Sequence, residues 1–255
     1  MTSMNTKAPR SSPPVLISFS GIDGAGKSTQ LEMLRARLLE AGLHVRLLRF
    51  WDDAATLKSL RESAGHRIFK GEKGVGTPAV PVNRQDKNVR SPLMTLVRLG
   101  TYLLDAVSLR ARIKGLAKKD VDVVIFDRYI YDEFANLNLQ SRLIDRYVHW
   151  LLPVVPRPLV SFVIDAEPEA ARARKPEYPL DFLIENRNAY LRVSRLGEHF
   201  YVTQPGSVDE VQATVWRRML HVVDAAELQG RSKRFADFKK RNSQTPEDKS
   251  LPSFT

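Results

Sequence analysis

Residues 15–29 read VLISFSGIDGAGKST and join a strand, a glycine-rich turn and the start of a helix. The run VLISFS is rich in β-branched and aromatic residues and ends at a glycine, which is typical of a buried strand. From Lys27 onward leucines recur at helical spacing until Gly42, which predicts a helix over this segment. A strand that turns through glycines into a helix indicates an α/β fold with a phosphate site at the turn.

The turn itself, GIDGAGKS at residues 21–28, fits the pattern G-x-x-x-x-G-K-[ST] without a mismatch. Glycines allow the backbone to curl so that several N–H groups point at one anion, and the following helix adds its positive end. Lys27 supplies a mobile charge for the β- and γ-phosphates, and the Ser28 hydroxyl is a ligand for Mg²⁺. The predicted nucleotide-binding residues are Gly21, Gly24, Ala25, Gly26, Lys27, Ser28 and Thr29. The loop alone is equally typical of GTPases, ATPase motors and small-molecule kinases.

Strands and helices are expected to alternate along the rest of the chain. The segment 121–126, VDVVIF, is apolar on both faces, which suits a strand at the centre of a parallel sheet. Further strands are expected at 44–50, 158–164 and 199–203, and helices at 54–69, 92–119, 130–137, 140–152, 167–174, 180–196 and 207–228. This alternation predicts a doubly wound, five-stranded parallel α/β sheet with helices on both faces. One buried stripe is expected on the helix at 92–119, made by Leu93, Leu96, Val97, Leu103, Leu104 and Val107.

The chain is expected to form one folded domain, residues 15–228, between two disordered segments. Residues 1–14 lack an apolar segment of the signal-peptide type, and residues 229–255 are strongly basic. The segment 71–91 is rich in glycine and proline, which predicts a flexible loop. Residues 166–179 contain prolines just after a short helix, so this segment is expected to move as a lid.

The net charge of +11 raises the question of nucleic-acid binding. From Arg231 onward there are seven Lys and Arg against three Asp and Glu, so a net +4 belongs to the tail. We interpret the tail as a solvated basic segment and expect no nucleic-acid partner. The sequence has no cysteine, and no apolar stretch approaches the ~20 residues that cross a bilayer, which favours a cytoplasmic protein without membrane contact.

Asp127 and Arg128 directly follow the central strand. In doubly wound sheets, ligands bind outside the carboxyl ends of the strands. There Asp127 can hold Mg²⁺ directly or through water, and Arg128 offers a planar fork that matches a phosphate. An ion pair that caps the strand is the structural alternative.

Three basic residues, Arg172, Arg174 and Lys175, lie within four positions after the strand at 158–164. Phosphoryl transfer spreads negative charge over the equatorial oxygens, and a cationic lid stabilises that charge while it excludes water. A solvated basic turn is the alternative. We predict Arg172 and Arg174 as catalytic residues together with Lys27 and Asp127.

Taken in order, these features resemble thymidylate kinases. The resemblance spans residues 15–225 and is carried by FSGIDGAGKSTQL (19–31), by Arg-Phe at the end of the second strand, by DRY (127–129) and by the Arg-rich lid. Thymidylate kinases transfer the γ-phosphate of ATP to dTMP with Mg²⁺. The resemblance therefore implies a P-loop nucleoside monophosphate kinase that uses ATP and Mg²⁺, with the metal near Ser28 and Asp127.

The resemblance also implies roles for single residues. Asp23 corresponds to a residue near the acceptor sugar, and Arg49 and Arg128 correspond to arginines that grip the acceptor phosphate. Gln204 lies in the segment 203–207, which borders the adenine of ATP in the family. Ala25 stands where one branch of the family has a basic residue, and the other branch supplies the catalytic arginine from the lid. A homodimer is implied by resemblance only.

The residues expected to read the base depart from the family. Thymidylate kinases usually have a Phe and, four residues on, an Arg that contact thymine; this chain has Leu103 and Val107 at that spacing. After DRY the family's Ser is replaced by Asp132, and its Tyr-Gln pair by Asn136-Leu137. We place Leu103, Val107 and Asp132 in the acceptor region and expect the acceptor to be dTMP or a related nucleoside monophosphate. The alternatives are a kinase of a non-nucleotide acceptor and a nucleotide-binding regulatory protein with low turnover.

Overall fold

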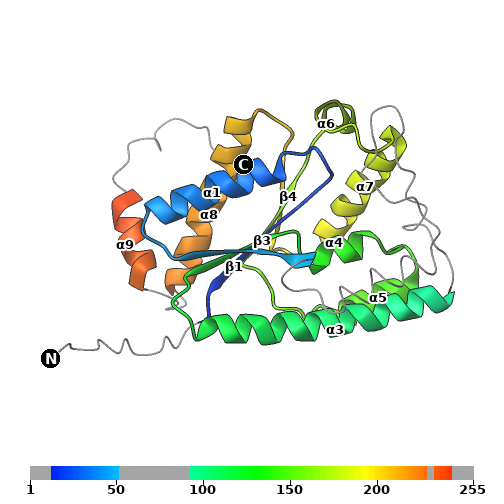
Figure 1. Cartoon of the computed structure of the whole chain (residues 1–255), viewed down its shortest axis with the longest axis horizontal. Helices are drawn as coiled ribbons and strands as arrows, with labels where there is room; N and C mark the ends of the chain where they lie inside the picture. Colours follow the sequence, from blue (N-terminus) through cyan, green and yellow to red (C-terminus); the bar gives the residue numbers. More distant parts are fainter. Residues whose placement is uncertain (1–12, 52–91, 229–232, 243–255) are drawn as a thin grey trace.

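The computed structural model describes residues 13–51, 92–228 and 233–242. These residues form one parallel sheet and the helices packed around it (Figure 1). The strands lie in the order β2-β3-β1-β4-β5, and every neighbouring pair is parallel. Their bounds are Val15–Ser20 for β1, Val45–Arg49 for β2, Val123–Asp127 for β3, Val160–Ile164 for β4 and Phe200–Thr203 for β5. The predicted five-stranded parallel α/β sheet is confirmed, with each strand present where the hydrophobic runs placed it.

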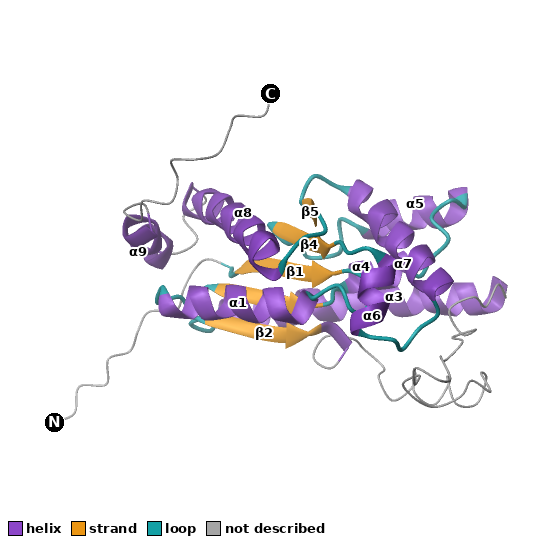
Figure 2. Ribbon diagram, turned by 90° about the horizontal axis from the view of Figure 1, so that it is seen from above, coloured by secondary structure: helices purple, strands orange, loops and turns teal. Residues whose placement is uncertain are grey.

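Helices lie on both faces of this sheet. Figures 1 and 2 show α1 and α8 on one side and α3 and α5 on the other. The helices are α1 (Lys27–Glu40), α3 (Pro92–Ala117), α4 (Ile130–Ala135), α5 (Arg142–Leu151), α6 (Pro168–Arg174), α7 (Leu180–Val193), α8 (Val208–Leu228) and α9 (Lys233–Asn242). Within the part of the chain that the structure describes, no helix is long and apolar enough to span a membrane.

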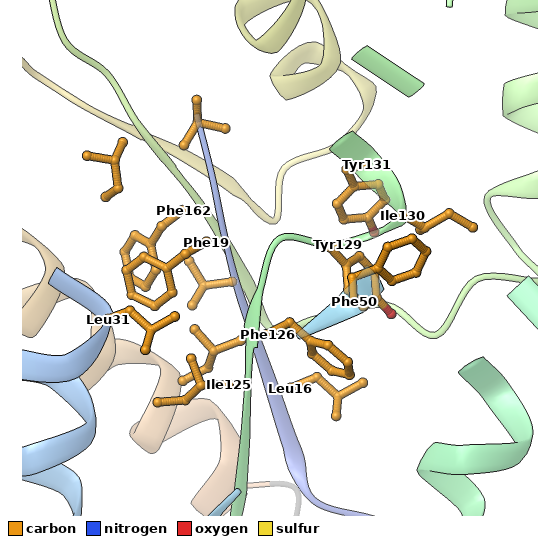
Figure 3. Close-up of a cluster of buried hydrophobic side chains, with 14 of the residues drawn as sticks. Leu16, Phe19, Leu31, Phe50, Ile125, Phe126, Tyr129, Ile130, Tyr131 and Phe162 are labelled. Atoms are coloured by element: carbon orange, nitrogen blue, oxygen red, sulfur yellow. The ribbon is translucent and has the colours of Figure 1, made fainter. Parts of the chain in front are cut away.

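The core lies where β1 and β3 run side by side through the middle of the sheet (Figure 3). Because side chains alternate along a strand, β1 presents Phe19 to one face and Leu16 to the other. On the first face Phe19 stacks on Phe162 with 5.0 Å between ring centroids, close to Leu31 of α1. On the second face Phe126 packs beside Leu16 (Figure 3). This two-sided burial fixes the carboxyl ends of both strands, from which the candidate site is built.

The expected buried stripe of α3 is wrong in part. Leu96, Leu104 and Val107 are 66%, 50% and 53% exposed, and Leu103 is half-buried. The residues that face the core are Tyr102, Asp105, Ala106, Leu109 and Ile113. The helix has apolar residues on more than one side, so helical spacing alone does not identify the inner side. The side chains of Leu93 and Val97 lie outside the described part.

The structure also corrects the expectation of a disordered tail, because residues 233–242 form α9. Phe235 and Phe238 of this helix are fully buried, and the Phe238 ring lies 5.7 Å from that of Trp216 in α8. Arg234 donates to both Asp120 (Nη2–Oδ2, 2.9 Å) and Asp122 (Nη1–Oδ2, 2.8 Å), which precede β3. Two apolar anchors and an ion-pair clamp thus attach α9 to the domain.

Several expectations lie outside the described residues. These are the helix at 54–69, the flexible loop at 71–91, residues 1–12 of the N-terminal segment, and the remainder of the basic tail.

His199, just before β5, gives the fold a predicted dependence on pH. Its Nε2 atom lies 2.9 Å from the Tyr131 hydroxyl, and the side chain is buried, which together with Arg157 lowers its pKa to about 4. Between pH 6.5 and pH 4, His199 is mostly protonated in the unfolded chain and mostly neutral in the folded chain. We therefore expect His199 to have no unfavourable effect on stability above pH 6.5. Below that pH, protonation of His199 in the unfolded chain should lower the free energy of unfolding, by roughly 3 kcal/mol at pH 4.

Urea unfolding at several pH values checks this prediction against a His199→Gln variant, whose side chain does not titrate in this range. The difference in stability between the two proteins should depend on pH by the amount above. Parallel pH curves for the two proteins would show that the folded chain accepts the proton at no cost.

Candidate active site

The loop between β1 and α1 has the geometry of an anion cradle. Gly21, Gly24 and Gly26 have φ angles of 138°, 81° and 88°, conformations that L side chains rarely adopt. Gly26 precedes α1 in the left-handed conformation, and no side chain caps this end of the helix. The first turn of α1 contains no acidic residue. Its free N–H groups and positive end are therefore available to a phosphate.

Lys27, the first residue of α1, folds back over this loop. Its Nζ donates a 2.7 Å hydrogen bond to the carbonyl of Ile22, and the side chain is buried. Burial, and next the positive charge of Arg128, lower the pKa of the Lys27 amine to about 8. The nearby carboxylates that oppose this shift are Asp23, Asp132 and Asp127. An anionic phosphate in the cradle would add to their effect and favour the charged amine.

The sheet register brings Asp127 and Arg49 to the same edge. Arg49 at the end of β2 is paired in register with Asp127 at the end of β3, which is also paired with Phe19 of β1. Arg49 is exposed and Asp127 is half-buried. Ser28, exposed in the first turn of α1, and Asp127 thus offer one hydroxyl and one carboxylate beside the cradle. This donor set fits Mg²⁺, which binds few protein oxygens and takes others from phosphates and water.

Arg128 and Asp23 contact each other directly. Nη2 of Arg128 lies 2.6 Å from Oδ1 of Asp23, so the Asp of the phosphate loop meets the Arg of the DRY sequence. Arg128 has a φ of 63°, and its backbone N–H donates to the carbonyl of Phe19. This left-handed conformation at the end of β3 turns the chain into α4. It leaves the guanidinium group partly exposed beside the cradle.

Helix α6, which belongs to the segment predicted to form a lid, contacts the loop between β1 and α1. A Cβ added to Gly24 would lie 2.2 Å from the carbonyl oxygen of Ala171, so only a glycine permits this approach. Arg172 and Arg174 follow Ala171 and are exposed on the last turn of α6. The two predicted catalytic arginines therefore lie one and three residues after Ala171, the residue that contacts the cradle.

Arg187 of α7 binds the segment that leads into α6. Its Nε and Nη2 donate to the two carboxylate oxygens of Asp165, both at 2.8 Å. Its Nη1 and Nη2 donate to Glu167 at 2.7 and 3.0 Å. Since Asp165 and Glu167 connect β4 to α6, this fork ties α7 to the segment from which the lid extends.

Comparison with known proteins supports the same reading of the geometry. No family model matches the sequence. The thymidylate kinase of Prosthecochloris aestuarii is 28% identical over 218 residues, 82% of this chain and 85% of that protein. The thymidylate kinase of Chlorobium luteolum is 28% identical over 209 residues, 78% of this chain and 85% of that protein. The chain is thus similar to thymidylate kinases over about four fifths of its length.

A solved structure agrees in fold. The crystal structure of thymidylate kinase from Ehrlichia chaffeensis matches with a TM-score of 0.50 and 21% identity. The match covers 81% of this chain and 99% of that one. The agreement extends over nearly the whole of that protein, so the two chains share the same overall fold.

The inner face of α3 lies one residue away from the predicted positions 103 and 107. Leu103 is half-buried and Val107 is exposed, whereas Tyr102 and Ala106 are buried at the same four-residue spacing. The Tyr102 ring lies 6.5 Å from that of Phe134 in α4, with an edge-on geometry. The inner face thus carries an aromatic residue followed by a small one. Gln204 is exposed just after β5.

Sequence reasoning missed three residues of the site: Ser20, Tyr190 and Arg187. Ser20 and Tyr190 both hydrogen-bond to Asp132, which is buried beneath Arg128. Tyr190 lies 58 positions from Asp132, in the last turn of an ordinary amphipathic helix, so no local pattern distinguishes it. Arg187 is equally inconspicuous in the sequence, because Arg172 and Arg174 lie closer along the chain to the acidic residues after β4.

Proposed function

We propose that the chain transfers the γ-phosphate of ATP to the phosphate of a nucleoside monophosphate. The observation that carries this proposal is the 2.6 Å contact between Asp23 and Arg128. Asp23 belongs to the loop that would hold the donor phosphates, and Arg128, partly exposed at the end of β3, would bind the acceptor phosphate. The relatives described above, all named thymidylate kinases, support the proposal.

The proposed reaction is an in-line displacement. An oxygen of the acceptor phosphate attacks the γ-phosphorus, the bond to the β–γ bridging oxygen breaks, and the products are ADP and a nucleoside diphosphate. Lys27 and the first N–H groups of α1 would bind the β- and γ-phosphates, and Arg49 and Arg128 would hold the acceptor. Arg172 and Arg174 of the lid would stabilise the transferred group. Mg²⁺, held by Ser28 and Asp127, would neutralise the charge that develops on the phosphates.

Positioning and charge neutralisation account for catalysis in this scheme. The acceptor phosphate is already an anion at neutral pH, so the site needs no strong general base. The buried network around Arg128 and the clamp of Arg187 hold the cationic groups before the substrates bind. This preorganisation is the main contribution that the described residues can make.

A panel of acceptors tests the proposed function. The protein would be incubated with ATP and Mg²⁺ and, in separate reactions, with dTMP, dUMP, dCMP, CMP, AMP, GMP and phosphorylated sugars, and ADP would be measured. We expect ADP formation with at least one nucleoside monophosphate. Activity with a sugar phosphate alone, or well-folded protein without ADP formation in any reaction, would contradict the proposal.

We also propose that two copies of the chain associate through α3 and α5. Exposed apolar side chains gather on these neighbouring helices, among them Leu104 and Val107 of α3 and Leu143 and Trp150 of α5, the last two 78% and 59% exposed. The same apolar surface on a second copy of the chain could cover these side chains in a symmetric dimer. Light scattering should give a mass twice the 28.9 kDa of one chain, and Leu104→Glu should halve it. A wild-type monomer would contradict the proposal.

A further inference from the structure

Asp132 is a buried carboxylate whose oxygens are all engaged by the protein. It lies in the first turn of α4 and is 3% exposed. Oδ2 accepts hydrogen bonds from the Ser20 hydroxyl (2.7 Å) and from the backbone N–H of Tyr129 (2.9 Å). Oδ1 accepts from the Tyr190 hydroxyl (2.8 Å) and lies 3.5 Å from Nη1 of Arg128. This carboxylate has little capacity left for a substrate.

The partners of Asp132 come from three elements that surround the candidate site. Ser20 ends β1 immediately before the phosphate loop. Tyr129 follows Arg128 at the turn from β3 into α4, and Tyr190 belongs to α7, which continues from the lid. One buried charge therefore joins the donor loop, the acceptor arginine and the helix behind the lid.

The network restrains Arg128 from several sides. Its φ of 63° is unfavourable for a residue with a side chain, by about 1 kcal/mol, so neighbouring contacts must hold it. Nη1 lies within 3.4 Å of the Tyr190 hydroxyl as well as near Asp132, and Nη2 is bound to Asp23. Burial raises the pKa of Tyr190 well above its ordinary value, so the hydroxyl stays protonated and can donate to Asp132 while it accepts from Arg128. The direction of the guanidinium fork is thereby fixed.

We propose that Asp132 is a positioning residue, which orients Arg128 toward the acceptor phosphate through a direct contact and through Tyr190. The proposal rests on the proposed function, in which Arg128 binds the acceptor. It replaces the expectation of a direct contact between Asp132 and the substrate. A serine at this position would be shorter and uncharged, with one oxygen to offer these four donors.

Kinetics of Asp132→Asn and Tyr190→Phe test the role. Each change removes part of the network without a large change in size. Each should raise the KM for the acceptor about tenfold, the effect of losing a hydrogen bond to a charged group, and change the KM for ATP less than twofold. The double variant should resemble either single variant, because both remove the same restraint on Arg128.

Tyr131→Phe is the matched control, because it also removes a buried tyrosine hydroxyl, whose partner His199 lies away from Arg128. It should lower stability and leave both KM values unchanged. If Asp132→Asn and Tyr190→Phe behave like this control, Asp132 only caps α4 and the inference is wrong. If Asp132→Asn does not fold, the KM values of Tyr190→Phe decide. Wild-type protein without phosphotransferase activity would instead contradict the proposed function, and the inference with it.

Discussion

Replacement of Lys27 by alanine is expected to lower kcat by about 10²- to 10³-fold, the usual effect of removing one donor to a developing negative charge. The side chain folds back over the loop, with Nζ 2.7 Å from the Ile22 carbonyl, and in the proposed function this amine binds the β- and γ-phosphates. No other lysine of the described residues is buried in this way. Steady-state rates at saturating ATP and acceptor measure the effect.

The same change should leave the folded state intact. The lowered pKa of Lys27 means that folding disfavours its charge, so removal of the amine relieves part of that cost. The lost hydrogen bond to Ile22 is worth about 1 kcal/mol, and the two effects oppose each other. The midpoint of thermal unfolding should therefore change little. Lys114→Ala, an exposed position on α3, controls for the loss of one positive charge. A Lys27→Ala protein with a kcat near that of this control would refute the assigned role.

The strands of this protein could be predicted because each is a local pattern. The β-branched run that forms β1 and the doubly apolar run that forms β3 are readable without tertiary information, and the glycine that ends α1 is equally local. The phosphate loop follows from residue types at fixed spacing. The exposed face of α3 could not be predicted, since Leu104 and Val107 are as apolar as the residues that the core selects.

Contacts between distant positions account for the rest. Tyr190 and Asp132 are 58 residues apart, and Arg234 meets Asp122 over 112 residues. Neither partner is unusual in its own segment, so a single sequence contains no sign of the pairing. The tail illustrates the same limit, because its basic composition predicts a solvated chain and conceals Phe235 and Phe238, which bury α9 against α8. Composition averages over the few residues that decide such packing.

Replacement of Gly24 by alanine is expected to detach the lid from the phosphate loop and to lower kcat by about 100-fold. The new methyl group would lie 2.2 Å from the carbonyl oxygen and 2.9 Å from the carbonyl carbon of Ala171. Both are backbone atoms of α6, so no side chain can rotate out of the way. The helix must move, and it would carry Arg172 and Arg174 away from the transferred phosphate.

The left-handed backbone at Gly24 complicates this experiment, because alanine is strained there by about 1–2 kcal/mol whatever surrounds it. Gly42, which follows α1 outside the candidate site, has the same φ of 81° and supplies the matched control. Gly42→Ala should cost a similar free energy of unfolding and keep a normal kcat. Hydrogen exchange without nucleotide should be faster in α6 of Gly24→Ala than in α6 of Gly42→Ala. Equal exchange and equal kcat in the two variants would show that the contact between Gly24 and Ala171 does not position the lid.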